Sequence, residues 1–208
     1  MRATTLVLAG LALWATSVPC LAQSPGPTVP KTTAESLLTE SVNFYEASNF
    51  EDSLLSAREA LRMLDWNSAV AYNNICTAHL GLEQYELAIE ACLKALEIWP
   101  KFKRAKNNLE WIYEIQAEKN PTVEVYLNLG QVRYWRGAFE ESIAASERAI
   151  ELDPENAIAH NNLCAAFAAS GKWPQAVVEC ELALAIDPEY QRAKNNLAWA
   201  QTGQTDGP

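Results

Sequence analysis

A ten-residue stretch near the middle of the chain recurs 88 residues later. Phe-Lys-Arg-Ala-Lys-Asn-Asn-Leu-Glu-Trp at 102–111 returns at 190–199 as Tyr-Gln-Arg-Ala-Lys-Asn-Asn-Leu-Ala-Trp. The same offset carries other residues onto identical ones: Asn73, Asn74, Cys76 and Cys92 onto Asn161, Asn162, Cys164 and Cys180. Identities that keep one spacing indicate an internal duplication. Duplicated chains fold as modular repeats, which more often bind partners than catalyse reactions.

The composition narrows the class of partner. The chain has 208 residues, is 49% hydrophobic and carries a formal net charge of −10. It is long enough for one elongated or two small domains. The acidic balance argues against general nucleic-acid binding, which needs a basic footprint, so no nucleic-acid partner is expected.

The first 22 residues are typical of a secretory signal peptide. Arg2 is followed by an apolar run, and Cys20-Leu21-Ala22 offers small residues to a peptidase before Gln23. We therefore expect a periplasmic or secreted protein with no membrane span after leader removal. An uncleaved anchor and a lipid anchor at Cys20 are alternatives, but the apolar run is short for a span and Pro19 fits acylation poorly. Residues 23–33 are rich in proline and predict a flexible spacer.

Beyond the spacer, apolar residues recur at helical spacing and no strand alternation is found. Helices are predicted to stop at Trp99-Pro100, Asp153-Pro154 and Asp187-Pro188, because proline is excluded from helix interiors. Gly137 and Gly171 suit left-handed helix ends. Asn120-Pro121 predicts a helix start, with Asn as cap and Pro in the first turn.

Between these marks the chain consists of helix pairs of about 34 residues. Small residues recur where two helices cross, and aromatic residues recur where gaps between helices must be filled. The pattern in 123–156 is Tyr126, Leu129, Gly130, Gly137, Phe139, Ser142, Ala149 and Pro154. It recurs in 69–102 and 157–190, and more weakly in 34–67. This pattern resembles the tetratricopeptide repeat, over about residues 34–203.

The resemblance implies an all-α fold, an α-solenoid of stacked helix-turn-helix units in a right-handed superhelix. The duplicated stretches add an extra helix at 103–119 and a capping helix at 191–203. We therefore expect about ten helices in two five-helix modules, 34–119 and 120–203, with a disordered tail at 204–208.

Four cysteines remain after leader removal and fall in pairs on the two helices of one repeat. They lie where tetratricopeptide helices pack most closely, and an exported protein meets an oxidising compartment. We predict the disulfides Cys76–Cys92 and Cys164–Cys180. The alternative is that these cysteines are small apolar core residues with free thiols.

Repeated asparagines predict where a partner binds. Asn74, Asn108, Asn128, Asn162 and Asn196 occupy equivalent positions on five successive first helices, whose face lines the concave groove in tetratricopeptide proteins. Such amides can bond the backbone of an extended peptide, as in the repeat domain of protein O-GlcNAc transferases. The predicted concave-face site is completed by Asn73, Asn107, Asn161, Asn195, Arg104, Arg192, Trp111 and Trp199. These residues could instead serve helix ends and seal the core.

The basic residues Lys101, Lys103, Arg104 and Lys106 form the densest cationic cluster. This cluster could dock an acidic segment or an anionic surface, or be a helix start balanced by Glu97 and Glu110. His79 occupies a position where an aromatic residue normally packs, which favours a core role. No nucleophile, phosphate loop or metal-ligand spacing is found, so no catalytic residue, metal or cofactor is expected.

We therefore predict a non-enzymatic adaptor that binds an extended segment of a partner protein, as a monomer or weak homo-oligomer. An alternative is a self-assembling structural protein driven by exposed Trp66 or Trp135. A less favoured alternative is a carbohydrate-binding protein, in which Trp111 and Trp199 stack on sugar rings.

Overall fold

The computed structural model describes residues 33–203, which form ten α-helices and no strand. The predicted leader with Cys20, the spacer up to residue 32 and the tail 204–208 lie outside the described residues. The helices are α1 (Ala34–Glu46), α2 (Phe50–Met63), α3 (Ala69–Gly81), α4 (Tyr85–Ile98), α5 (Lys103–Lys119), α6 (Val123–Arg136), α7 (Phe139–Leu152), α8 (Ala157–Ala169), α9 (Trp173–Ile186) and α10 (Gln191–Thr202). The predicted all-α repeat fold is confirmed.

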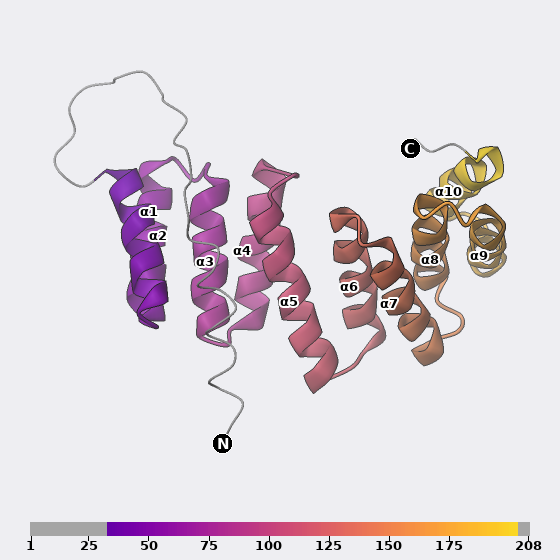
Figure 1. Ribbon diagram of the computed structural model, residues 1–208, viewed down its shortest axis with the longest axis horizontal. Coiled ribbons are helices and arrows are strands. Elements are labelled where there is room, and N and C mark those ends of the chain that lie inside the picture. The colour runs from indigo at the N-terminus through magenta and orange to yellow at the C-terminus, as the bar shows by residue number, and fades with distance from the viewer. Residues whose placement is uncertain (1–32, 204–208) are drawn as a thin grey trace.

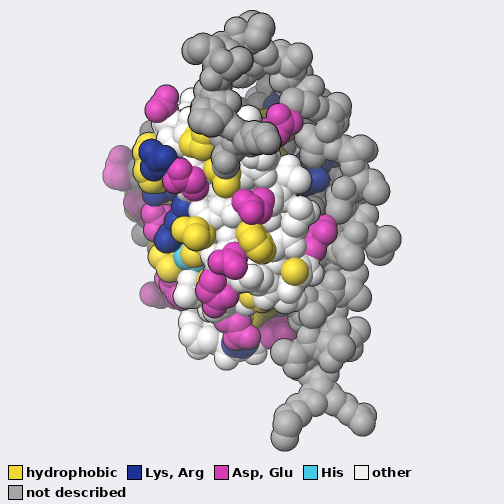
Figure 2. All heavy atoms as spheres, turned by 90° about the vertical axis from the view of Figure 1, so that its left-hand side faces the viewer, with side chains coloured by type: hydrophobic (Ala, Val, Ile, Leu, Met, Phe, Trp, Pro, Cys, Tyr) yellow, Lys and Arg dark blue, Asp and Glu magenta, His cyan; other side chains and the backbone are white. Residues whose placement is uncertain are grey.

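The helices stand in an elongated row and successive helices run in opposite directions (Figure 1). Each helix packs on the next one in the chain. Within each module every second helix also contacts the next, α1 with α3, α3 with α5, α6 with α8 and α8 with α10. We call these six helices the first helices, because each either begins a pair or, in α5 and α10, occupies the same position without a second helix. We call α1–α5 module 1 and α6–α10 module 2. Seen from the α1–α2 end, acidic side chains are spread among hydrophobic ones (Figure 2).

Helix starts follow from short polar side chains. The side chains of Ser68, Thr122 and Asn156 accept hydrogen bonds from backbone N–H groups three residues on, and so cap α3, α6 and α8. Thr122 corrects the predicted cap of α6. Asn120 is the C-cap of α5, and Pro121 lies in the link before α6. The Thr122 hydroxyl, 3.3 Å from the Val125 nitrogen, takes the role assigned to Asn120.

Helix ends match the predicted breaks. Gly137 and Gly171 have φ angles of +80° and +77°, the left-handed conformation that lacks a steric cost only in glycine. Asp153 and Asp187 are the C-caps of α7 and α9, each directly before proline. The link after α2 lacks proline, and Asp65 and Trp66 instead adopt left-handed φ angles of +48° and +60°.

Small residues let the two helices of each pair cross closely. In the first and third pairs hydroxyl groups bridge the crossing: Ser53 Oγ donates to the Ser41 carbonyl at 2.8 Å, and Ser142 Oγ to the Gly130 carbonyl at 2.8 Å. In the second and fourth pairs the crossing holds cysteines that are completely buried. The repeats thus alternate two kinds of cross-link at the same place.

The apolar core continues across the predicted boundary at residue 120. Leu129, Val132 and Ala145 of module 2 belong to the same buried cluster as Leu109 and Ile112 of α5. A polar network covers this contact. Arg133 of α6 bonds Glu110 and Glu114 of α5 at 3.1 Å and 2.8 Å, and Arg136 also pairs with Glu110.

The odd fifth helix reverses the direction of the second module. Because α5 and α6 are successive and antiparallel, α6, α8 and α10 run opposite to α1, α3 and α5 (Figure 1). Links that follow a pair therefore lie on one edge in module 1 and on the other edge in module 2. The five asparagine-bearing helices do not form one parallel series.

Candidate functional site

A hollow of about 150 Å³ lies on the first helices of module 2. It is lined by Gly130, Gln131, Tyr134 and Trp135 of α6, Ser142 of α7, Asn161, Asn162 and Ala165 of α8, and Arg192 and Asn196 of α10. Four of the predicted site residues, Asn161, Asn162, Arg192 and Asn196, therefore come together here. Packing of α6 against α8 and of α8 against α10 brings them into one place.

Several predicted amides bond within the protein. Asn108 Nδ2 donates to Asn73 Oδ1 at 3.0 Å, and Asn196 Nδ2 donates to Asn161 Oδ1 at 2.9 Å. Asn74 Nδ2 donates to the Leu38 carbonyl at 3.3 Å. Asn73, Asn74, Asn108 and Asn161 are buried. The bonds of these four residues join neighbouring first helices. For Asn73, Asn74 and Asn108 the structure therefore corrects the expectation of ligand-facing amides, whereas Asn161 also lines the hollow.

The remaining predicted polar residues keep exposed surface. Asn107, Asn195, Arg104 and Arg192 are exposed, whereas Asn128, Asn162 and Asn196 are half-buried. Asn195 Oδ1 accepts a bond from Gln191 Nε2 at 2.9 Å. No described residue forms a hydrogen bond with the amide of Asn162, which therefore keeps both donor and acceptor capacity inside the hollow.

The two predicted stacking tryptophans pack into the protein. Trp199 is only 7% exposed and meets Trp173 edge-on at 5.9 Å between ring centroids. Trp111 is half-buried and packs on the module 1 core. Their rings close helix contacts, so the structure does not support the role of Trp199 as a stacking surface for a sugar or side chain.

Six of the ten lining residues were not assigned to the site from the sequence, and three of these six, Gln131, Tyr134 and Trp135, have large side chains on α6. The spacing of Gln131, Tyr134 and Trp135, three and four residues apart, places them on one face of α6. This spacing is the feature of the sequence from which they could have been assigned to the site. Trp135 is partly exposed, whereas the Tyr134 ring packs on Phe139 at 5.6 Å. Burial raises the pKa of Tyr134, which keeps its hydroxyl neutral and able to donate.

Arg192 is the one charged residue among those that line the hollow. Its side chain bonds the Tyr190 hydroxyl, which also accepts from Asn161 Nδ2 at 3.5 Å. Burial, the larger effect, raises the pKa of Tyr190, while Arg192 opposes it. The hollow thus combines an aromatic wall, amides and one guanidinium with no carboxylate, in a strongly acidic chain.

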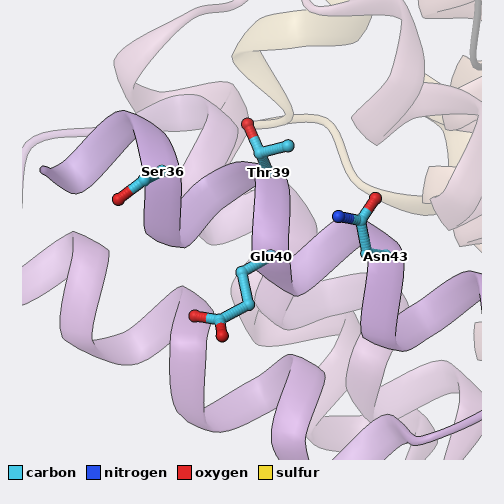
Figure 3. Close-up of a pocket in the computed structure, with 4 residues that line it drawn as sticks. All are labelled: Ser36, Thr39, Glu40 and Asn43. Carbon is cyan, nitrogen blue, oxygen red and sulfur yellow. The ribbon is translucent and has the colours of Figure 1, made fainter. Parts of the chain in front are cut away.

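A second hollow lies on α1 and is shallow. Its lining residues are Ser36, Thr39, Glu40 and Asn43. They lie three or four residues apart on one face of α1, and their side chains are spread along that face and do not converge (Figure 3). Glu40 accepts a bond from Ser56 at 3.3 Å. This surface has no arrangement that would hold a ligand.

The cysteines pair as the sequence suggested. Disulfides join Cys76 to Cys92 and Cys164 to Cys180, with 5.3 Å between the Cα atoms of each pair. Each fits the predicted pairing and joins the two helices of one repeat.

Histidine and carboxylate groups occupy structural positions. His79 is buried and its Nδ1 bonds Gln84 at 2.7 Å. His160 bridges the Glu179 carboxylate at 2.7 Å and the Pro154 carbonyl at 3.0 Å. Within residues 33–203 no three His, Cys, Asp or Glu side chains are arranged to hold a metal ion. Among the described helices, none is both long and apolar enough to cross a bilayer.

The stacked helix pairs and the hollow on their first helices define an α-helical repeat scaffold. Residues 69–102 match the family model described as tetratricopeptide repeat, and residues 130–171 match a second model described as TPR repeat. The chain contains tetratricopeptide repeats, as the resemblance implied. Such repeats stack into superhelices with extended binding surfaces and serve as protein–protein interaction scaffolds.

A curated relative supports the same family. Small glutamine-rich tetratricopeptide repeat-containing protein 2 of Mycosarcoma maydis is 25% identical over 133 residues, which is 64% of this chain and 32% of that protein. The chain therefore spans about a third of the length of that relative.

Three of the solved structures that the chain matches have TM-scores below 0.5. TTC0263, a thermophilic TPR protein of Thermus thermophilus, is 16% identical with a TM-score of 0.44, over 82% of this chain and 100% of that one. YrrB, described as a TPR protein with an unusual peptide-binding site, is 19% identical with a TM-score of 0.40, over 77% and 90%. MamA is 18% identical with a TM-score of 0.39, over 82% and 81%.

Proposed function

We propose that the module 2 hollow binds an extended segment of a partner protein. The observation that carries this proposal is the half-buried Asn162 amide, which no described residue bonds although it lines the hollow. Gln131 offers a second amide beside it. Amides that donate and accept at one level suit the alternating N–H and C=O groups of a peptide backbone.

The hollow also offers anchors for side chains. The partly exposed ring of Trp135 provides apolar contact area, and binding energy at interfaces concentrates on such aromatic residues. Arg192, held by the Tyr190 hydroxyl, contributes a positive charge at the α10 side. The volume of about 150 Å³ fits one or two side chains of a peptide and is too small for a folded domain.

A displayed library of 12-residue peptides, panned against the chain, tests this proposal. Affinities of selected peptides are measured by fluorescence anisotropy for the wild type, for Trp135→Ala/Asn162→Ala and for the control Asn107→Ala, an exposed amide outside the hollow. We expect the double variant to bind on the order of tenfold more weakly or worse, since a hydrogen bond contributes about 1 kcal/mol and a buried aromatic anchor more. Equal affinity of the double variant and the wild type would remove the hollow from the mechanism.

We also propose that the protein acts in the periplasm or the secreted space. The signal-like leader and the two disulfides support this location, because disulfides persist in oxidising compartments. Intact-mass analysis of protein from its own cells should give a chain that starts at Gln23 and takes up no alkylating reagent before reduction. A mature chain that retains Met1 and reacts at its cysteines would contradict export, and an acyl mass on Cys20 would show the lipid-anchored alternative.

A further inference from the structure

An exposed edge of module 1 combines large apolar side chains with basic ones. It is formed by the link at 64–68 after α2, the link at 99–102 after α4 and the helix residues beside them. Trp66 is 60% exposed and Trp99 is 50% exposed, and Leu64 and Ile98 are exposed beside them. Lys101 and Lys103 are exposed, and no ion pair within the described residues neutralises either. We call these six residues the tryptophan edge.

The two links lie on the same side of the module. They precede α3 and α5, which run in the same direction (Figure 1). The bond between Asn73 and Asn108, each early in its helix, holds these two helix starts at the same level. α1 also begins on this side, with Thr33 as its cap.

Exposed Trp66 lies in a backbone conformation that costs conformational free energy. Asp65 and Trp66 are successive non-glycine residues with left-handed φ angles, and each such residue costs about 1 kcal/mol or more. Trp99 is held differently, since its ring stacks on the buried ring of Phe102 at 4.8 Å. The structure therefore places both tryptophans with at least half of their surface exposed.

Module 2 provides an internal comparison. Its corresponding links, 153–156 and 187–190, contain Asp153, Glu155, Asp187 and Glu189 and no basic residue. At the offset of 88 residues, Trp99, Lys101 and Lys103 correspond to Asp187, Glu189 and Gln191. The same fold thus forms with acidic links, so neither the tryptophans nor the lysines are needed for folding of such an edge.

The distribution of charged residues favours an anionic surface as the partner of the tryptophan edge. Lys101, Lys103, Arg104 and Lys106 at and beside the start of α5 outnumber the acidic residues Asp65 and Glu97 beside the edge and Glu35 in the first turn of α1. The acidic links of module 2 face the other side, because the odd helix α5 reverses its helices. A helix of 14 residues is about 20 Å long, which exceeds the screening length of about 8 Å at physiological salt. The net negative charge of the chain then does not prevent approach by this edge.

We propose that the tryptophan edge binds the surface of an anionic lipid bilayer. Indole rings prefer the interface between headgroups and acyl chains, and neighbouring lysines interact with anionic headgroups. Peripheral binding by exposed apolar residues plus a basic cluster requires no spanning helix. This inference concerns a different surface from the module 2 hollow and stands independently of the peptide-binding proposal.

Vesicle binding tests the inference. The chain from Gln23 onward, which contains every described helix, is used so that the apolar leader cannot bind vesicles itself. It is mixed with vesicles of phosphatidylcholine alone or with three-tenths phosphatidylglycerol. Co-sedimentation gives the affinity, and the emission shift of tryptophan reports insertion. We expect binding to the anionic vesicles and a blue shift of the tryptophan emission. Binding should be weaker in 1 M salt, because the electrostatic screening length is shorter there.

The decisive variant is Trp99→Asp/Lys101→Glu/Lys103→Gln, which gives the edge the residues of its module 2 counterpart. The control Lys172→Glu/Lys194→Glu changes the net charge equally, at two exposed ion pairs of module 2. We expect the first variant to bind on the order of thirtyfold more weakly or worse, because each lysine at an anionic surface contributes about fivefold. The control should bind like the wild type, and circular dichroism should show both variants folded.

Three outcomes would overturn the inference. They are failure of the wild type to bind anionic vesicles, equal binding to neutral vesicles, and an equal loss in the edge variant and the control. Self-association of the wild type through this edge without vesicle binding would likewise overturn it and favour a second copy of the chain as occupant. Because peptide affinity is measured at another surface, none of these outcomes bears on the module 2 hollow.

Discussion

At the scale of single residues, equivalent positions in the repeats use different chemistry for one task. The crossing of paired helices is bridged by serine hydroxyls in the first and third pairs and by disulfides in the second and fourth. In each case the side chain is small enough for the two helices to approach closely, and its hydrogen bond or disulfide joins them. Stability should therefore depend strongly on these few buried positions.

Removal of one disulfide is expected to destabilise the protein substantially. A loop of 16 residues closed by a disulfide contributes about 3 kcal/mol in the chain-entropy model. Cys76→Ala/Cys92→Ala should lower the free energy of unfolding in urea by that order, and Cys164→Ala/Cys180→Ala by a similar amount, because its loop has the same length. Stability identical to the wild type in both double variants would show that the bonds do not form.

Alkaline pH should destabilise the fold through Tyr113. Burial, with a smaller effect of Glu124, raises the pKa of Tyr113 to about 12. Because the folded pKa exceeds the unfolded value of about 10, this contribution is complete below pH 10 and is lost as the pH rises towards 12. Urea unfolding between pH 9 and pH 11.5 should show a steeper decline for the wild type than for Tyr113→Phe. Parallel curves would contradict the assignment.

At the scale of elements, the junction between α5 and α6 holds a network of two arginines and two glutamates. The guanidinium of Arg133 reaches two carboxylates of α5, and Arg136 reaches one of them. Glu110, predicted to balance the basic cluster at the start of α5, pairs across this junction instead. Its twin in α10, the last of the described helices, is Ala198. The paired charges are therefore specific to the helix that continues into another module.

Loss of this network should be measurable against an exposed pair. Arg133 and Glu110 side chains are 18% and 12% exposed, whereas Arg148, paired with Glu151, is 56% exposed. Arg133→Ala should lower the free energy of unfolding by about 1–3 kcal/mol, between the values for exposed and buried pairs, and Arg148→Ala by less than about 1 kcal/mol. A smaller effect for Arg133→Ala than for Arg148→Ala would mean that the network contributes nothing to the junction.

Some elements follow from sequence and others do not. Helix ends are marked by proline after α4, α7 and α9 and by glycine after α6. These residues can be read from the sequence because each acts through its own allowed backbone conformations. The cysteine pairing follows from repeat positions. The exposure of Asn73 or Trp199 depends on how first helices pack side by side, which local pattern does not determine. Thr122 and Asn120 are both good caps, and only the structure chooses between them.

At the scale of the whole molecule, the odd number of helices in each module determines where the module 2 hollow and the tryptophan edge lie. The module 2 hollow lies on first helices that run opposite to those of module 1, so the predicted ladder of five amides is interrupted at α5 and α6. The tryptophan edge lies on the side of module 1 that the acidic links of module 2 do not share. One surface is built from amides, an aromatic wall and an arginine, and the other from indoles and lysines.

Site-specific photo-crosslinking tests the central claim, that the hollow holds a partner's extended segment. A photoreactive amino acid is placed at Gln131 within the hollow or at Val178, an exposed residue of α9 outside it. After irradiation in the native cells, adducts are mapped by mass spectrometry. We predict that position 131 captures a short contiguous segment of one partner protein, whereas position 178 does not. An absence of adducts at 131, or the same adducts from both positions, would contradict the account.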